Sequence, residues 1–330
     1  MPDSFYLLVI VILIAIGFGI SNGFNDAANS IATVIGTRVL SARIAIAMAA
    51  VLIFAGTLTG TAVAITIAKG VIEPGQVTIY TVLAAELAAV IWVLAATYYG
   101  MPISVSHSLV AGLVGAGIAS GGADIIIWAK FTRVLSSVVC APVLGFMGGF
   151  ALMVLVMWLF RKSAPARVRG LFSNMQILSA GFLAYSHGKN DGQMPMGLIF
   201  LALMLYYPET YGGSSIPFWV ISLSAASISL GTAFGGWRVI RTVGLKITTL
   251  RPVHGFVANV SAATVIEAAS HFGIPVSTTH CVSSSIMGVG ATRRLSAVRW
   301  GVARSIIIAW VLTLPACCLL GWLLGLIFEG

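Results

Sequence analysis

Charged side chains are scarce in this sequence. Asp, Glu, Lys and Arg make up only 8% of its 330 residues, whereas hydrophobic residues make up 59%. A soluble globular chain carries roughly 25% charged residues, so this chain lacks the polar surface of a soluble protein. The alternating segments of an outer-membrane barrel are also absent. Several apolar runs instead reach the ~20 residues that cross a bilayer as a helix. The sequence therefore predicts an all-α polytopic membrane protein.

Acidic residues are rarer still, at 9 against 18 basic residues. We expect loops at 38–43, 161–170, 238–251 and 293–304 that contain no Asp or Glu. Because basic loops stay in the cytoplasm, we expect these loops inside and both termini outside the cell membrane. The net charge of +9 is thereby explained without nucleic acid. The loops hold Arg38, Arg43, Arg161, Lys162, Arg167, Arg169, Arg238, Arg241, Lys246, Arg251, Arg293, Arg294, Arg299 and Arg304. The opposite segment ends hold Asp3, Glu73, Asp124, Glu209 and Glu329, together with Lys69, Lys130 and Arg133.

Cysteine is equally sparse, and its placement excludes two roles. Cys140, Cys281, Cys317 and Cys318 lie in apolar runs without metal-ligand spacing, so neither a disulfide framework nor a metal centre is expected. A basic stretch before the first apolar run is also missing. That run is therefore expected to be a helix and not a signal peptide.

The hydrophobic residues fall into ten expected segments. The first and sixth exceed the length of one plain helix and contain a polar stretch. The fourth and ninth begin with a proline among hydroxyl residues, so we expect these four to be broken or re-entrant helices. The segments are 5–37, 44–68, 77–99, 101–123, 134–160, 172–207, 216–237, 254–271, 273–292 and 305–328.

Two motifs occur twice and in the same order. The first half contains GFND (Gly23–Asp26) and then GMPISVSH (Gly100–His107), and the second contains GKND (Gly188–Asp191) and then GIPVSTTH (Gly273–His280). Each half has five segments, an odd number, so the halves enter the membrane from opposite sides. Such inverted-topology repeats are typical of secondary transporters. We expect one transport domain made of membrane repeat 1 (1–160), a basic cytoplasmic linker (161–171) and membrane repeat 2 (172–330).

The proline stretches have the composition of an anion site. A proline at the first turn of a helix loses nothing by lacking an N–H. The next backbone N–H groups are free, and the helix dipole adds positive charge there. Two such sites facing each other can surround a tetrahedral oxyanion with neutral donors. The hydroxyl donors are Ser104, Ser106, Ser277, Thr278 and Thr279.

The Asn-Asp pairs supply the opposite chemistry. Asp26, Asp191, Asn25, Asn29 and Asn190 offer the oxygen ligands that hard cations prefer. A carboxylate repels a neighbouring anion unless a cation lies between them, which couples the two ligands reciprocally. A hard cation, with Na⁺ as one candidate, is therefore expected at Asp26 and Asp191. The same carboxylates can carry a proton instead, because burial disfavours the charged form, and the choice between Na⁺ and H⁺ stays open.

Other interpretations of these residues remain open. Polar groups in membrane helices also serve as packing contacts between helices. His107 and His280 either brace the hairpin turn or touch the ligand. Glu86 and Glu267 are each a proton carrier or a structural charge. Lys189 balances a motif carboxylate or touches the anion.

The stretches GFNDAANSIATVIGT, SHGKNDGQ, MPISVSH and IPVSTTHCVSSSIMGVG resemble the inorganic phosphate transporter (PiT) family over nearly the whole chain. The resemblance implies cation-coupled symport of inorganic phosphate by alternating access. It places phosphate at Ser104, Val105, Ser106, Ser277, Thr278 and Thr279, the cation at Asn25, Asp26, Asn29, Asn190 and Asp191, and His107, His280, Glu86 and Lys189 in support.

The sequence departs from the family pattern at three places. Pro195 in MPMG can move the helix break, and Lys189 is unusual inside its motif. The long central hydrophilic loop of larger members is missing. Resemblance also implies a PhoU-like cytoplasmic partner that the basic loops would dock. A homodimer is compatible with such a bundle, although no residue requires it.

Three competing functions were weighed. A permease for sulfate or another oxyanion would share the fold, but sulfate permeases of this type lose the Asn-Asp and His motifs, which favours phosphate here. An intramembrane hydrolase is disfavoured because Ser106 and His107, adjacent on a helix, diverge and pair poorly. A passive anion channel is disfavoured because carboxylates beside the anion would block its flow. We therefore expect a transporter that is not an enzyme and needs no cofactor.

Overall fold

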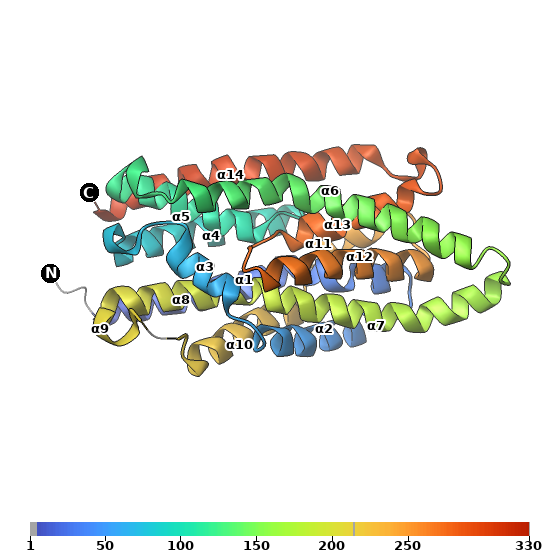
Figure 1. The fold of residues 1–330 in the computed structure, drawn as a ribbon, viewed down its shortest axis with the longest axis horizontal. Helices are drawn as coiled ribbons and strands as arrows, with labels where there is room; N and C mark the ends of the chain where they lie inside the picture. The colour runs from blue at the N-terminus through green and yellow to red at the C-terminus, as the bar shows by residue number, and fades with distance from the viewer. Residues whose placement is uncertain (1–4, 214, 330) are drawn as a thin grey trace.

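The computed structural model describes residues 5–213 and 215–329, so the predicted outer residue Asp3 lies outside the described part. Figure 1 shows a bundle of helices that run roughly along the long axis of the molecule. The first repeat comprises α1 (Phe5–Gly36), α2 (Ala42–Thr57), α3 (Ala62–Gly70), η1 (Pro74–Gln76), α4 (Ile79–Tyr99), α5 (Val105–Gly121), η2 (Ala123–Ile125) and α6 (Trp128–Leu159).

The second repeat follows after a short turn. It comprises α7 (Pro165–Asp191), α8 (Gln193–Tyr206), α9 (Pro208–Tyr211), α10 (Phe218–Phe234), α11 (Trp237–Arg241), the π-helical turn η3 (Thr242–Lys246), α12 (Pro252–His271), α13 (Thr278–Ala291), η4 (Leu295–Ala297) and α14 (Trp300–Glu329). The residues of the expected linker 161–171 are helical from Pro165 onward.

Each of the ten expected segments is helical. Among the described residues, α1, α4, α6 and α14 are long and apolar enough to cross a membrane, and two bent pairs pass the same test. The pairs are α2 with α3, bent by 67°, and α10 with α11–η3, bent by 64°. An all-helical membrane fold with broken helices is therefore confirmed, while the number of crossings stays a prediction.

One of the four expected breaks lies elsewhere. The first segment is one continuous helix through the Asn-Asp motif, so the predicted break there is wrong. Its polar side chains bond to other helices and leave its own backbone ladder intact. The break occurs instead in the second segment, between Thr57 and Ala62. The sixth segment is interrupted as predicted, at Gly192, and the predicted loop 238–251 is helical from its start to Lys246.

The two proline motifs lie at the tips of two helical hairpins. The α4–α5 hairpin is closed at its base by the antiparallel bridge between Ile72 and Ile126. The α12–α13 hairpin is closed at its base where Arg299 N donates to Ile247 O over 2.9 Å. In Figure 1 the bases lie toward opposite ends of the molecule and the tips meet near its middle. The inverted repeat of the sequence is thus an inverted pair of hairpins.

The same local chemistry builds both tips. α4 ends at Gly100 (φ 68°) and α12 is followed by Gly273 (φ 66°), left-handed conformations that glycine adopts without strain. The chain then runs extended through the proline to a serine N-cap. The Oγ atoms of Ser104 and Ser277 accept the backbone N–H three residues on, over 3.2 and 3.1 Å. The expected position of Pro102 and Pro275 in the first helical turn is therefore wrong, because the helices begin three residues later, at Val105 and Thr278.

The repeats interleave, so that neither completes its own packing. α5 packs on α14 and α13 on α6, while α1 packs on α10 and α2 on α7. The motif glycines allow the last two crossings. A Cβ on Gly23 would lie 2.1 Å from the carbonyl oxygen of Ile228, and one on Gly188 would lie 2.1 Å from that of Ile53. Each Gly-x-Asn-Asp motif therefore begins where two helix backbones touch.

Replacing Gly188 with Ala is expected to lower the thermal midpoint of the purified protein. The new methyl group would overlap the α2 backbone, and overpacking of this kind costs about 1–3 kcal/mol. The matched control is Gly17→Ala in α1, where a Cβ would have nothing within 4 Å. Thermal unfolding followed by size-exclusion fluorescence compares the two. Equal midpoints would contradict the close backbone contact.

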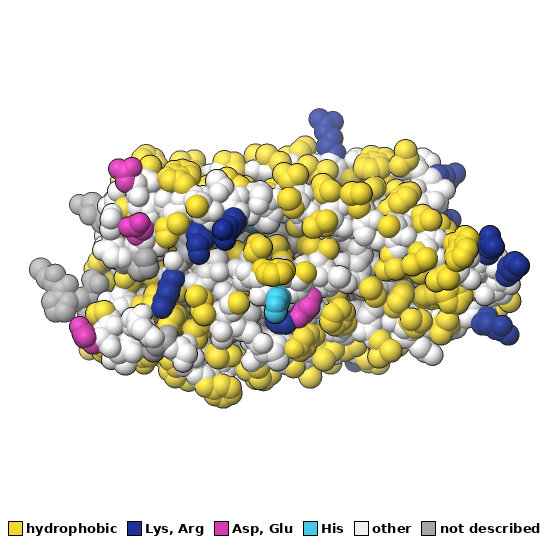
Figure 2. Space-filling model, in the orientation of Figure 1, with side chains coloured by type: hydrophobic (Ala, Val, Ile, Leu, Met, Phe, Trp, Pro, Cys, Tyr) yellow, Lys and Arg dark blue, Asp and Glu magenta, His cyan; other side chains and the backbone are white. Residues whose placement is uncertain are grey.

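Acidic and basic side chains are distributed unevenly between the two ends of the bundle. Figure 1 shows both chain ends at one end of the bundle and the turn between α6 and α7 at the other. Figure 2 shows acidic side chains gathered at the first end and most Lys and Arg side chains toward the second on this face. The acidic and basic ends expected from the sequence are therefore opposite ends of the structure.

Candidate functional site

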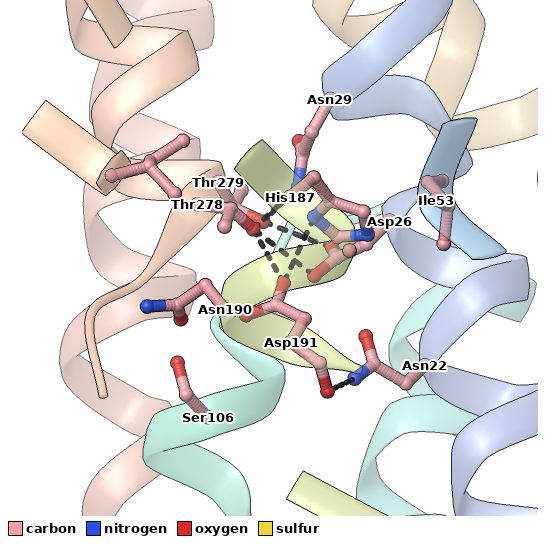
Figure 3. Close-up of polar contacts among 12 residues, drawn as sticks. Asn22, Asp26, Asn29, Ile53, Ser106, His187, Asn190, Asp191, Thr278 and Thr279 are labelled. Atoms are coloured by element: carbon pink, nitrogen blue, oxygen red, sulfur yellow. Dashed lines mark hydrogen bonds and ion pairs between the residues drawn. The ribbon is translucent and has the colours of Figure 1, made fainter. Parts of the chain in front are cut away.

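Two carboxylates from different repeats meet two hydroxyls at the tip of the α12–α13 hairpin (Figure 3). The Thr278 hydroxyl donates to Asp191 Oδ2 over 2.8 Å and reaches Asp26 Oδ2 at 3.4 Å. The Thr279 hydroxyl donates to Asp26 Oδ1 over 3.0 Å. Asp26 comes from α1, Asp191 from the last residue of α7, and the threonines from the first turn of α13. The predicted anion donors and cation ligands thus lie in direct contact.

His187 completes this group. Its Nδ1 lies 3.0 Å from Asp191 Oδ2, because residues four apart share one face of α7. Ligand atoms of Asp26, His187 and Asp191 all lie within 4.8 Å of one another, and all three side chains are buried. We call these three residues and Thr278 and Thr279 the central cluster.

The motif asparagines divide between this cluster and its surroundings. Asn29 Nδ2 donates to Thr279 Oγ1 over 2.9 Å and to Thr278 Oγ1 over 3.2 Å. Asn25 instead faces α4, where its Nδ2 donates to Thr97 Oγ1 over 2.7 Å. The structure therefore places Asn29 at the cluster, and Asn25 makes its hydrogen bond away from it.

Asn190 ties the end of α7 to the second hairpin. Its Nδ2 donates to Ser270 Oγ over 2.9 Å. With the amide turned over, its nitrogen would lie 3.0 Å from Asp191 Oδ1. Asn22 Nδ2 also reaches the Asp191 carbonyl oxygen at 3.5 Å. Amides from both repeats therefore surround the Asp191 region.

The first hairpin tip approaches the second beside the cluster. The Ser106 hydroxyl donates to Val276 O over 3.1 Å, and Ser104 Oγ lies 3.3 Å from Ser106 Oγ. Val105, between them, is buried. The His107 and His280 rings meet edge to face with centroids 5.1 Å apart. The two copies of the proline motif, one from each repeat, therefore touch each other.

Each motif histidine also contacts the long helix that follows its own hairpin in the chain. His107 Nε2 lies 3.2 Å from Ser137 Oγ of α6. The His280 ring stacks on Trp310 of α14 at 4.0 Å between centroids. The Trp310 Nε1–H donates to Pro102 O over 3.1 Å, which fixes the first tip. These contacts agree with the first of the two expected roles, in which the histidines brace the tips.

Two further predicted residues lie apart from the central cluster. Lys189 forms an ion pair with Glu267 of α12, so both expected alternatives for Lys189 give way to a pairing between two partly exposed charges. Glu86 is fully buried on α4, and neither of its carboxyl oxygens has a hydrogen-bond partner among the described residues. The structure gives Glu86 no polar link to the cluster.

The central cluster brings two carboxylates close together in a buried position. Asp26 and Asp191 are 2% and 1% exposed. Two carboxylates this close and this buried repel each other unless a cation or proton lies with them. The Asp, Asn and Thr oxygens suit a hard cation such as Na⁺. Because the threonine hydroxyls bond to these same carboxylates, any anion held by the hydroxyls would sense the cation directly.

His187 and Asn22 are the site residues that sequence reasoning missed. Both stand next to the recognised motifs, one turn of helix before Asp191 and Asp26 respectively. Since residues four apart on a helix share a face, that spacing was the available signal.

Three comparisons place this chain among known proteins. It matches the phosphate transporter family over residues 22–321. It is 44% identical over 320 residues to a probable low-affinity inorganic phosphate transporter of Rhizobium meliloti, covering 96% of this chain and 95% of that one. It is 40% identical to one of Bacillus subtilis, covering 98% of each. A solved structure, "The sodium-dependent phosphate transporter", superposes with a TM-score of 0.90 at 29% identity, over 98% of this chain and 99% of the other.

Proposed function

The chain belongs to the phosphate transporter family, whose members are not enzymes, and we propose that it carries inorganic phosphate across the cytoplasmic membrane in symport with a cation. Similarity to phosphate transporters along nearly the whole chain supports the substrate. The family also makes it a multi-pass membrane protein.

The observation that carries the symport proposal is the position of the Thr278 hydroxyl. It contacts a carboxylate from each repeat, at 2.8 and 3.4 Å. Without a cation, the hydroxyl proton is directed to these carboxylates. A cation bound between Asp26 and Asp191 would neutralise them and free the hydroxyl for a phosphate oxygen. Phosphate and cation would then each raise the affinity for the other by the same factor.

Phosphate would bind where the two tips meet. The first turns of α5 and α13 meet there from opposite repeats, with the Ser106 hydroxyl on Val276 O and the Thr278 and Thr279 hydroxyls on the two carboxylates. The proposed phosphate residues are Ser104, Val105, Ser106, Ser277, Thr278 and Thr279. The bent pairs α2–α3 and α10–α11 flank the tips from either side and are the elements that would move during alternating access.

Na⁺ is the proposed coupling ion. The cluster offers oxygen ligands at a buried, doubly negative position, and the superposed structure is named as sodium-dependent. H⁺ is the alternative, with Asp26, Asp191 or His187 as its carrier. The basic loops would face the cytoplasm and both termini the outside, and a PhoU-like protein would dock on those loops. A homodimer stays a prediction from the sequence.

Labelled phosphate uptake into proteoliposomes tests this function. A sodium gradient, a proton gradient or neither is imposed in turn, with excess unlabelled sulfate as competitor. We expect uptake driven by sodium and insensitive to sulfate. Uptake driven only by a proton gradient would show that H⁺, and not Na⁺, is the coupling ion. Uptake suppressed by sulfate would change the substrate, and equal uptake without any gradient would overturn symport.

A further inference from the structure

A cavity of about 400 Å³ lies beside the tip of the first hairpin, outside the proposed transport site. Its walls include Gly100 at the end of α4 and Arg238, Arg241, Thr242 and Lys246 of α11 and η3. The Thr242 hydroxyl donates to Gly100 O over 3.0 Å, which joins the two walls. The cavity therefore opens only a few residues from Ser104, on the side where the basic loops are expected.

The charge lining this cavity is positive throughout. Arg238 donates to Tyr98 O and lies over the Tyr98 ring, 4.6 Å from its centroid, so its guanidinium is held in place. Within the described residues, neither Arg241 nor Lys246 forms an ion pair. No acidic residue lines the cavity. Three cations that line one cavity without a counter-charge create a positive potential that attracts anions.

A matching contact on the other side of the molecule is built without these cations. α3 stands against the tip of the second hairpin as α11–η3 stands against the first. The Thr66 hydroxyl donates to Gly273 O over 2.8 Å, which matches the bond from Thr242 to Gly100. A Cβ on Gly273 would first meet Ala62, just as one on Gly100 would first meet Arg238.

This correspondence aligns Arg238 with Ala62 and Arg241 with Ile65. The residues at all four positions are exposed, and two buried residues separate the members of each pair. One copy of the scaffold is thus uncharged where the other carries two guanidinium groups. The corresponding contact with the hairpin thus forms without guanidinium groups. A position on the cytoplasmic side would account for basic residues in this segment, whereas their gathering around one cavity suits an anionic ligand.

We propose that this cavity is a second binding site for a phosphate group, separate from the transport site and independent of the coupling cation. Guanidinium groups bind phosphate through paired N–H donors, and Lys246 adds a mobile point charge. The volume is at the lower end of the range for small-molecule sites. Because the wall is already positive, no Na⁺ is needed to hold the anion.

Two sources can supply this phosphate group. Inorganic phosphate leaving the hairpin tips would meet the cavity first if the basic end is cytoplasmic. A phospholipid headgroup is the other source, since Trp237 and Tyr99 also line the cavity and are 51% and 73% exposed, and such aromatic residues favour the headgroup region. Both sources present the same chemical group to Arg238, Arg241 and Lys246.

³¹P line broadening of inorganic phosphate measures binding directly. The full-length protein is purified in a phosphorus-free maltoside detergent and titrated with phosphate in sodium-free buffer. We expect broadening with the unaltered protein and with Asp26→Asn. The double variant Arg241→Gln/Lys246→Gln should weaken the apparent affinity at least tenfold. The matched control, Arg167→Gln/Arg169→Gln, removes two exposed charges of α7 and should leave it unchanged.

A lipid arm separates the two sources. Phosphatidylglycerol is added, and its own ³¹P resonance is followed. Broadening of the lipid signal together with displacement of inorganic phosphate assigns the site to a headgroup; persistent phosphate broadening assigns it to the free ion. Absent broadening, or the same broadening in Arg241→Gln/Lys246→Gln, overturns the proposal. Sodium-free binding without any uptake into liposomes would overturn the proposed function and leave this site standing.

Discussion

Asp26→Asn and Asp191→Asn are each expected to reduce sodium-driven phosphate uptake at least a hundredfold. The amide keeps the size of the side chain but removes one of the two charges that would hold the cation. A hundredfold loss corresponds to about 2.7 kcal/mol, slightly below the roughly 3–5 kcal/mol lost when one partner of a buried charge pair is removed. Initial rates in proteoliposomes under a sodium gradient measure the effect.

The design of this test separates coupling from folding. Asp124→Asn is the matched control, because Asp124 is exposed on η2 at the acidic end and should leave the rate unchanged. Size-exclusion profiles of all three variants check that the bundle is intact. Sodium-driven uptake near the unaltered rate in either Asp26→Asn or Asp191→Asn would refute the assignment of that carboxylate to the cation.

Thr278→Val is expected to lower phosphate uptake at least tenfold and to flatten its dependence on sodium. The valine fills the same space, but the one hydroxyl among the described residues that reaches both carboxylates is lost. Asn29 also loses one of its two acceptors. A buried group left unpaired costs about 1–3 kcal/mol, and the proposed phosphate donor disappears at the same time. Uptake rates over a sodium titration give both quantities.

Thr292→Val, at the C-cap of the same helix, is the matched control for Thr278→Val. The Thr292 hydroxyl donates only to Val289 O at the far end of α13, so its loss should leave uptake nearly unchanged. If Thr278→Val retained a steep sodium dependence and a normal rate, the shared hydroxyl could not be the link between anion and cation.

The sequence predicted the features that local rules determine. Pro102 and Pro275 each lie two residues after a glycine and two residues before a serine, so a helix break at both places was predicted, although a hairpin was not distinguished from a kinked span. The duplicated motifs also predicted that Asp26 and Asp191 share one centre. These conclusions need only the spacing within each motif and the repetition of the pair.

The break between α2 and α3 could not be predicted in the same way. Residues 58–61 contain no proline, and the surrounding run is apolar. The free N–H groups at the start of α3 are satisfied by the second repeat, where Gln193 Oε1 accepts Val63 N and Ala64 N over 2.8 and 3.1 Å. A helix end that is capped from 130 positions away leaves no local signal.

The pairing of Lys189 also depends on tertiary structure. Its charge suggested a role beside Asp191, two residues on, but residues two apart on a helix face different directions. Lys189 therefore turns to Glu267 on α12, while Asp191 turns to His187 and Thr278. Only the packing of α7 on α12 determines which face of the motif meets which partner.

The interleaved packing of the repeats sets the order in which the chain can reach its final state during synthesis. The first hairpin tip is held by Trp310, so it waits for a helix made some two hundred residues later. The second hairpin, by contrast, finds α6 already present when it leaves the ribosome. The first hairpin is made early, but the helix that holds its tip is made late. The N-terminal half must therefore persist as an incompletely packed intermediate until translation is nearly complete. A ribosome stalled before α14 would leave the α4–α5 tip unclamped in the bilayer.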